Sequence, residues 1–320
     1  MSAAKRISVS NIERAALEID PVFIHSPQFV NEPMNDVLGC EITLKLETMN
    51  PIRSFKGRGA DFFFRENREM VTSRQVVCAT AGNFGQAVAY AAARNGVKPI
   101  VYCATNANPL KVERMKRLGA DVRQAGENFD ASKEAAKEYC AQHGAYFVED
   151  GRDVAISEGA GSIAVELMNG QAFDSIVVPL GNGALISGVA TWIKHVQPSV
   201  RVIGVSSRGA DAMEASWKSN SVIERPSVDT IADGIAVRTP VPEALADMRG
   251  VVDDVVLVDE SSILTAMRTL FVTSGIVGEP AGVAGIAALL EHASLRRGRV
   301  ATIVCGSNVT DDQMKRWLFP

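Results

Sequence analysis

The sequence contains few of the residues that usually bind metals or form catalytic triads. Its five cysteines include no Cys-x-x-Cys pair, and its four histidines are scattered without metal-ligand spacing. A zinc site or a Ser-His-Asp triad therefore has no support in the sequence. The odd, widely spaced cysteines predict reduced thiols that are mostly buried as small apolar groups. They are Cys40, Cys78, Cys103, Cys140 and Cys305.

An excess of positive charge and long apolar runs are also missing. The formal net charge of -4 leaves no basic footprint for nucleic acid and no polybasic patch for a membrane. No apolar run approaches the roughly 20 residues that cross a bilayer. Residues 1–18 lack the basic, apolar and small-residue order of a signal peptide, so we expect the mature protein to start here and to be cytoplasmic.

What the chain does contain is a regular alternation of short β-rich runs and amphipathic helical patterns. Several of the runs are continuously apolar, as expected when helices cover both faces of a sheet. The pattern predicts an α/β fold with open, twisted, mostly parallel sheets flanked by helices. The expected strands are 41–46, 75–79, 98–103, 121–124, 145–148, 175–179, 201–205, 254–258 and 299–304. The expected helices are 84–94, 109–118, 130–143, 185–196, 260–274 and 280–295.

Three junctions that follow expected strands are rich in small residues. Ligands of open α/β sheets bind just outside the carboxyl ends of the strands, so these junctions are candidate binding loops. The junction at residues 78–86 could bind a carboxylate or phosphate at a helix start, or could be a tight turn with an Asn cap. The junction at 178–188 fits neither G-x-G-x-x-G nor a P-loop, which favours a monophosphate. In the third, Cys305 is either a core thiol or a weak hydrogen-bond partner of a ring nitrogen.

Lys56 lies between a strand-like and a helix-like stretch, after Phe55 and among small residues. An isolated lysine is usually a solvated surface cation. A lysine held in this setting can instead form a Schiff base with a carbonyl compound. The other junctions favour the second interpretation.

Together these segments resemble the fold-type II pyridoxal-phosphate enzymes, and within them the serine/threonine dehydratase and serine racemase group. The resemblance covers roughly residues 19–308, and the motifs occur in the order of that family. They are Ser54-Phe55-Lys56-x-Arg58-Gly59-Ala60 (lysine motif), Ala81-Gly82-Asn83-x-Gly85-Gln86 (substrate loop), Pro179-x-Gly181-x-Gly183 (phosphate loop), Thr230-Ile231-Ala232-Asp233-Gly234 and Glu279-Pro280-Ala281-Gly282.

The resemblance implies a role for each matching residue. Lys56 would form a Schiff base with pyridoxal 5'-phosphate and then remove the α-proton of the substrate. Cys305 would face the pyridine nitrogen. A thiol cannot keep that nitrogen protonated, and this favours β-elimination over transamination. The implied cofactor-binding set is Phe55, Lys56, Asn83, Gly181, Asn182, Gly183, Ala184, Leu185, Glu279 and Cys305. The implied substrate-binding set is Thr80, Ala81, Gly82, Asn83 and Phe84.

Several residues depart from the family pattern. Ala81 replaces the serine that acts as a second acid/base in serine racemases, so elimination is expected and racemisation is not. Phe84 replaces a histidine common in threonine dehydratases, and Asn182 and Ala184 alter the tetraglycine loop. No metal site is expected, because two positions that bind a divalent cation in many relatives are occupied by Ser206 and Ala212, although Asp211 is adjacent.

The resemblance predicts an ammonia-lyase that removes water from L-threonine, L-serine or a related β-hydroxy amino acid and yields a 2-oxo acid and ammonia. The leaving hydroxyl would take a proton from the cofactor phosphate. A β-replacement enzyme of the cysteine synthase type is an alternative, although its usual loop sequences are absent. A non-catalytic amino-acid-binding relative is another, and the retained Lys56 speaks against it. A nicotinamide dehydrogenase is disfavoured by the missing third glycine.

The expected organisation has two domains. Residues 1–74 and 153–320 would form a large cofactor-binding domain, and residues 75–152 a small substrate-loop domain that closes over the substrate. The resemblance also implies a homodimer. The only other partner expected is a small amino-acid substrate.

Overall fold

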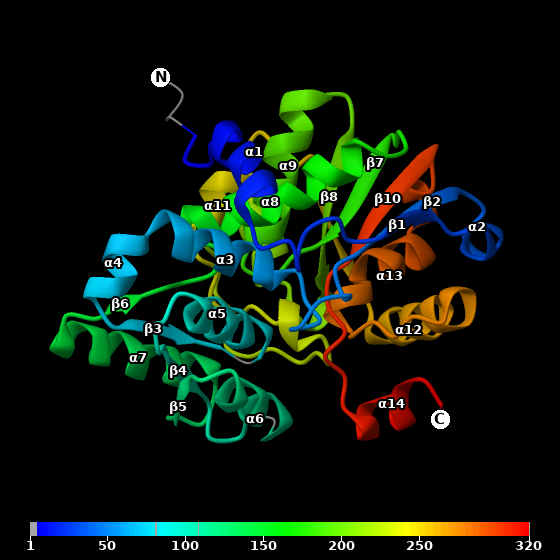
Figure 1. Cartoon of the computed structure of the whole chain (residues 1–320). Coiled ribbons are helices and arrows are strands. Elements are labelled where there is room, and N and C mark those ends of the chain that lie inside the picture. The colour runs from blue at the N-terminus through cyan, green and yellow to red at the C-terminus, as the bar shows by residue number, and fades with distance from the viewer. Residues whose placement is uncertain (1–4, 81, 108, 320) are drawn as a thin grey trace.

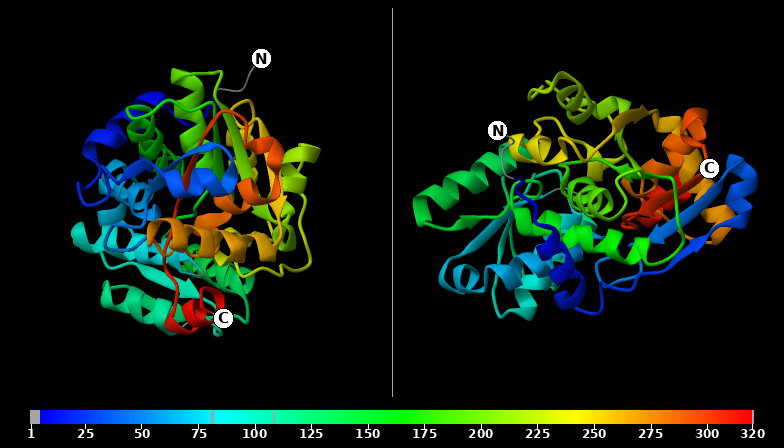
Figure 2. Two further views of the ribbon diagram at one scale, coloured as in Figure 1. Left: turned by 90° about the vertical axis from the view of Figure 1, so that its right-hand side faces the viewer. Right: turned by 90° about the horizontal axis from the view of Figure 1, so that it is seen from above.

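Residues 5–80, 82–107 and 109–319 are described by the computed structural model of the chain. They form an α/β fold with two sheets, a six-stranded one and a four-stranded one, flanked by helices (Figure 1). Turned views show the four-stranded sheet and its helices as a lobe beside the larger one (Figure 2). No described helix combines the length and the apolar character needed to cross a membrane.

The larger sheet has the strand order β1-β2-β10-β7-β8-β9. All neighbouring pairs are parallel except β1 and β2, where Gln28 pairs with Lys45 in antiparallel register. The last strand in the sequence therefore lies in the middle of the sheet, between β2 and β7. The strands are β1 (Gln28–Val30), β2 (Glu41–Leu46), β7 (Ser175–Pro179), β8 (Arg201–Ser207), β9 (Asp254–Val258) and β10 (Arg299–Val304).

The smaller sheet is entirely parallel and has the order β5-β4-β3-β6. Every residue of β3 and β4 is buried, as expected for strands with helices on both faces. The strands are β3 (Val76–Ala79), β4 (Ile100–Cys103), β5 (Asp121–Gln124) and β6 (Tyr146–Phe147).

Helices cover both faces of the larger sheet. Along β7, Ile176 and Val178 pack in one core cluster with side chains of α8 and α9, whereas Val177 packs in another with α12 and α13. Successive residues of a strand point to opposite faces, so this division separates the two helical layers. The helices are α1 (Val9–Glu18), α2 (Glu32–Leu38), α3 (Lys56–Glu66), α4 (Arg68–Ser73), α5 (Asn83–Arg94), α6 (Pro109–Arg117), α7 (Phe129–His143), α8 (Val154–Met168), α9 (Ala184–Val196), α10 (Ala212–Ser219), α11 (Pro242–Met248), α12 (Glu260–Ser274), α13 (Ala284–Glu291) and α14 (Asp311–Trp317).

The structure confirms the fold class and all nine expected strands, within three residues at their ends. One expected helix was wrong in detail, and some elements, among them β1 and α8, were not predicted. The continuous helix at 280–295 is α13 flanked by single 3₁₀ turns, Ala281–Val283 and Ala293–Leu295. The antiparallel strand β1 was not predicted, because three residues are too short to show a period. Helix α8 was missed because it is buried nearly all round and carries small residues such as Gly159 and Gly161.

The side chain of Arg58, in the first turn of α3, is fully buried in a network of charges. Its guanidinium donates to Glu47 (Nε–Oε2 2.8 Å) and to Glu166 (Nη1–Oε1 2.7 Å). Lys45 also donates to Glu166 (Nζ–Oε2 2.6 Å), so the two cations balance the two carboxylates. Although burial opposes ionisation, the hydrogen bond and charge of Arg58 lower the pKa of Glu166 to about 2. The carboxylate therefore stabilises the fold above its ordinary pKa of 4.5, and this contribution is lost as the pH falls towards 2.

Replacing Arg58 by methionine is expected to destabilise the fold strongly. The change leaves Glu47 and Glu166 buried without their cation, and breaking a buried pair in this way costs about 3–5 kcal/mol. Urea unfolding measures the loss. Arg208→Met is the matched control, because Arg208 is half-exposed and its pairs with Asp259 and Glu291 contribute about 0–1 kcal/mol. Equal losses for the two variants would contradict a structural role for the buried network.

Candidate active site

A cavity of about 840 Å³ lies where the carboxyl ends of strands from both sheets face each other. Its walls include the segments that follow β3 and β6 of the smaller sheet and β7 and β10 of the larger one. The predicted site residues come together here. Those that line the cavity are Phe55, Lys56, Thr80, Gly82, Asn83, Phe84, Gly181, Asn182, Gly183, Ala184, Leu185, Glu279 and Cys305. Ala81 lies outside the described residues.

Lys56 is the first residue of α3, and the loop before it is fixed to the segment after β10. Phe55 donates its backbone N–H to the carbonyl of Cys305 (3.0 Å), and Ser307 donates to Arg53 (3.0 Å). The amide of Asn308 donates to the carbonyl of Ile52 (2.9 Å). These contacts hold the start of α3 at the edge of the larger sheet, so the position of Lys56 is set by the backbone on both sides.

The side chain of Lys56 projects into the cavity and is only 14% exposed. Its Nζ forms an ion pair with Asp150. The same nitrogen lies 4.7 Å from the ring centroid of Phe55 and 6.0 Å from that of Phe84. A lysine amine in an apolar setting with one carboxylate beside it can serve as a nucleophile or base once its proton is removed.

The loop after β7 leads into α9 and forms a cradle of backbone on the opposite wall. Gly183 has a φ of +90°, which favours glycine, and no described side chain caps the helix start. A Cβ at Gly181 would lie 2.8 Å from the carbonyl oxygen of Gly234, so only glycine fits there. Free N–H groups at a helix start attract an anion. The cradle fits the phosphate of the predicted cofactor.

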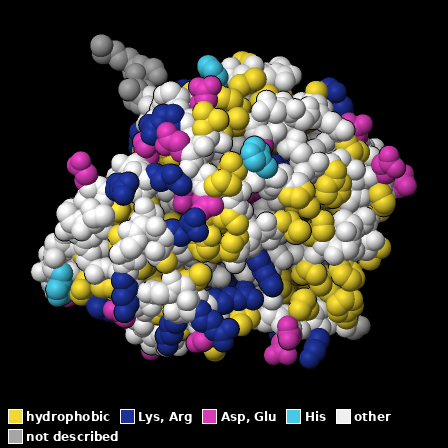
Figure 3. Space-filling view, viewed as in Figure 1, with side chains coloured by type: hydrophobic (Ala, Val, Ile, Leu, Met, Phe, Trp, Pro, Cys, Tyr) yellow, Lys and Arg dark blue, Asp and Glu magenta, His cyan; other side chains and the backbone are white. Residues whose placement is uncertain are grey.

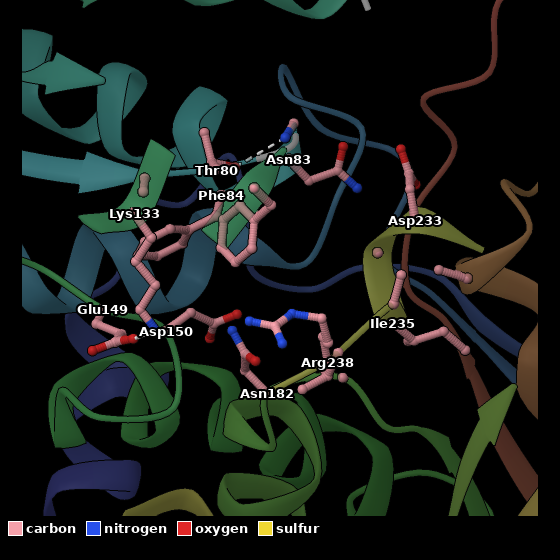
Figure 4. Close-up of a pocket in the computed structure, with 18 of the residues that line it drawn as sticks. Thr80, Asn83, Phe84, Lys133, Glu149, Asp150, Asn182, Asp233, Ile235 and Arg238 are labelled. Atoms are coloured by element: carbon pink, nitrogen blue, oxygen red, sulfur yellow. Dashed lines mark hydrogen bonds and ion pairs between the residues drawn. The ribbon is translucent and has the colours of Figure 1, made fainter. Parts of the chain in front are cut away.

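The loop after β3 is ordered by side-chain hydrogen bonds at both ends. The hydroxyl oxygen of Thr80 accepts from the N–H of Gly82 (2.9 Å). Asn83 donates to Glu279 (2.6 Å) and accepts from Asn308 (2.8 Å). The amide of Asn83 is thereby aimed into the cavity at the start of α5, as Figure 4 shows. A substrate carboxylate could bind to the backbone of this loop.

Two buried ionisable groups, Cys305 and Glu279, line the cavity. Burial raises the pKa of the Cys305 thiol, so the group is neutral, and its Sγ lies 3.8 Å from the carbonyl oxygen of Ala281. Burial, followed by the nearby charge of Asp233, raises the pKa of Glu279. A neutral thiol can meet a ring nitrogen as a weak hydrogen-bond partner and brings no charge to it.

Several charged residues that line the cavity were not predicted. Lys133 forms an ion pair with Glu149, and Arg238 with Asp130. Figure 4 shows Asp150, Asn182 and Arg238 directed towards one another across the cavity. The sequence contained a signal for two of the residues near these pairs. Glu149 and Asp150 directly follow an expected strand, as the three small-residue junctions also do. The signal was missed because that junction begins with charged residues, which usually face solvent.

The positions considered for a metal are occupied by other contacts. Ser206 is buried and donates to the carbonyl of Leu180 (3.1 Å), and Asp211 pairs with Arg225 (2.7 Å). Within the described ranges, no three His, Cys, Asp or Glu side chains are grouped as they would be around a metal ion.

Comparison with known proteins gives a consistent result. Residues 26–306 match the family described as pyridoxal-phosphate dependent enzyme. The chain is 34% identical over 305 residues to the biosynthetic L-threonine dehydratase of Halalkalibacterium halodurans, covering 94% of this chain and 73% of that protein. It is 33% identical to the L-threonine ammonia-lyase of Thermotoga maritima (97% and 78% covered). The solved structure of maize serine racemase is similar, with a TM-score of 0.90, 27% identity and coverage of 97% and 96%.

Replacing Gly181 by alanine is expected to weaken binding of pyridoxal phosphate by about tenfold or more, because the added Cβ would lie 2.8 Å from the carbonyl oxygen of Gly234 and the loop must shift. A tenfold loss corresponds to about 1.4 kcal/mol. Binding is measured by titrating the cofactor-free protein and following absorbance. Pyridoxal, which lacks the phosphate, should bind the variant and the unchanged protein alike. Ser227→Ala, at another part of the cavity wall, is the control. Equal losses for both ligands would contradict phosphate binding at this loop.

Proposed function

The chain belongs to the family of pyridoxal-phosphate dependent enzymes, and from that membership we propose that it is an ammonia-lyase. The reaction is elimination of water from L-threonine, L-serine or a related β-hydroxy amino acid, which yields a 2-oxo acid and ammonia. One observation carries the proposal: Lys56 projects into a cavity that also contains the glycine loop and the Asn83 loop. The names of the relatives described above support the same reaction class.

The residues present fit the cofactor, and each has a role in holding it. Lys56 would hold its aldehyde carbon, and the loop from Gly181 to Leu185 its phosphate. Asn83 would bind the ring hydroxyl, and the neutral Cys305 would face the ring nitrogen. When bound, pyridoxal phosphate supplies an electron-withdrawing ring that stabilises negative charge at the substrate Cα.

The chain's own residues position the substrate and move its protons. The backbone at Thr80, Gly82 and Asn83 binds the substrate carboxylate and turns Cα towards Lys56. Lys56, as the neutral amine, removes the proton at Cα. The rings of Phe55 and Phe84 keep water away from that nitrogen. Because the sequence has Ala81 where serine racemases carry the serine that acts as a second acid/base, we infer elimination without racemisation.

We also propose that residues 75–152 form a domain that closes over the substrate, with residues 1–74 and 153–320 as the larger domain. Two ion pairs that cross the cavity support this division. Lys111, in α6, pairs with Asp233, and Asp130, in α7, pairs with Arg238. Each pair joins the smaller-sheet segment to a loop of the larger lobe, so both would hold a closed form.

Replacing Asp130 by asparagine is expected to raise the KM for the amino acid by about two- to fivefold, because the ion pair is partly exposed. The value of kcat should change less, since no catalytic group is altered. Asp121→Asn is the matched control, because its partner Arg123 lies on the same strand. Steady-state kinetics compare the two. An unchanged KM in Asp130→Asn would count against a closing role for this pair.

Homodimer assembly and a cytoplasmic location are further parts of the proposal. Exposed hydrophobic side chains on one side of the larger lobe support a dimer. They include Val272 of α12, which is 81% exposed, and Val37 of α2, which is 51% exposed. Figure 3 shows hydrophobic side chains gathered near α12. Burial of such a surface against a second copy would be favourable.

The purified protein loaded with pyridoxal phosphate is expected to release 2-oxo acid and ammonia from L-threonine or L-serine. Lys56→Ala should reduce the rate by at least about 1,000-fold, because both covalent attachment and the base are lost. Borohydride reduction followed by peptide mapping should place the cofactor mass on Lys56. A panel of bulkier β-hydroxy amino acids tests whether Phe84 widens the substrate range. The proposal fails if no β-hydroxy amino acid yields product while the cofactor is bound.

A further inference from the structure

Lys111 is a lysine of the cavity wall that has so far been given no contact with the substrate. It lies in the first turn of α6, and its side chain is only 8% exposed. Its Nζ forms an ion pair with Asp233, which is its one hydrogen-bond partner among the described residues. An ammonium carries three N–H donors, and buried donors are rarely left unsatisfied. The remaining donors are therefore available to a group bound in the cavity.

The side chain of Lys111 lies directly against the loop after β3. A Cβ at Gly82 would lie 2.7 Å from Cδ of Lys111 and 3.2 Å from its Nζ. A larger residue at position 82 would therefore displace the lysine. Gly82 belongs to the loop to which the substrate carboxylate is proposed to bind. A carboxylate bound at Gly82 would be next to the ammonium.

The acidic groups near this loop make a cation necessary for binding an anion there. Glu279 accepts from Asn83, and Figure 4 shows Asp233 on the same side of the cavity as Asn83. The positive charge of Lys111 opposes the rise in the pKa of Glu279 that burial, first, and Asp233 cause. Without Lys111, a substrate carboxylate would meet two acidic side chains and only the partial positive charges of the backbone.

We propose that Lys111 binds the α-carboxylate of the amino-acid substrate, together with the backbone of the loop after β3. This inference rests on the proposed ammonia-lyase function and adds a full charge to the contacts that the backbone supplies. A hydrogen bond between an ammonium and a carboxylate is stronger than one between neutral groups. Lys56 cannot take this part, because it is reserved for the cofactor.

The contact would also couple substrate binding to closure of the site. Lys111 belongs to the smaller lobe, whereas Asp233 belongs to a loop of the larger lobe. A substrate carboxylate held by Lys111 would therefore join a chain of charges that crosses the cavity. The side chain of Asp233 is 48% exposed, so water can solvate it while the ammonium shares its donors with the substrate.

The test compares two ligands that differ in the carboxylate. L-alanine and L-alaninamide both carry the α-amino group and have no leaving group, so binding is measured without elimination. Each is titrated into the protein loaded with pyridoxal phosphate, and the absorbance of the bound cofactor reports the complex. Lys111→Met should lower the preference for L-alanine over L-alaninamide by about tenfold or more, the usual effect of losing a charge-assisted hydrogen bond. Lys111→Arg keeps the charge and should recover part of the preference.

Two further variants distinguish substrate binding from a purely structural ion pair. Asp233→Asn breaks the same pair but leaves the ammonium, so the preference for L-alanine should be unchanged or higher. Lys133→Met removes another lysine of the cavity wall, whose charge Glu149 balances, and should change the preference by at most about twofold. The assignment is overturned if Lys111→Met leaves the preference intact, or if either of the other two variants lowers it as much.

Should Lys111→Met fail to fold, Lys111→Gln provides the same comparison. The outcome for Lys111 is separate from that for the reaction, because neither ligand is eliminated. Binding of L-alanine that depends on Lys111, with no elimination from any β-hydroxy amino acid, would refute the proposed function and leave the carboxylate site in place.

Discussion

The buried guanidinium of Arg58 holds the first turn of α3, the helix that begins with Lys56. Its donors are divided among Glu47, Glu166 and two serine hydroxyls, Ser26 and Ser162, so its orientation has little freedom. These partners belong to the residue that follows β2, to the helix α8 and to the chain between α1 and β1. A planar, fully charged group that satisfies several acceptors at fixed angles is poorly replaced by lysine. Arg58 lies two residues after Lys56, so this network and the backbone contacts to the segment after β10 together hold the start of α3.

Both walls of the cavity follow from strand order. Parallel strands end at one edge, and the loops after them meet there, which is the usual location of ligands in this class of fold. Glu279 and Asn308 link these loops, since Asn83 contacts both and Asn308 also binds the backbone before Lys56. The side of the cavity that carries Lys56 is therefore held by backbone contacts to the segment after β10. Helices α6 and α7 of the smaller lobe are joined to the larger lobe across the cavity mainly by ion pairs. Closure and opening would be easier on the side joined by ion pairs.

The sequence was sufficient to predict most of the cavity and every strand except β1. Continuous apolar runs identify buried strands such as Ser175–Pro179, and small residues after them identify loops that ligands can approach. Asp150 and Arg238 could not be found in this way. In a sequence, a charged residue is usually taken to be solvent-exposed unless its ion-pair partner is known. Lys56 and Asp150 form such a pair, but they are far apart in the sequence. The charge network around Arg58 was not predicted for the same reason, although Arg58 itself belongs to the lysine motif. Pairing over such separations is a property of the tertiary structure.

The central place of β10 in the larger sheet has a consequence for how the chain folds. This strand is the last to be synthesised, yet it pairs with β2 on one side and β7 on the other. Until it is in place, the amino-terminal antiparallel pair β1-β2 has no partner in the sheet, and the loop before Lys56 lacks its anchor. Contacts between segments so distant in sequence form slowly and leave strand edges unprotected meanwhile. The cavity is thus complete only after β10 has paired, and until then the loop before Lys56 has no fixed place.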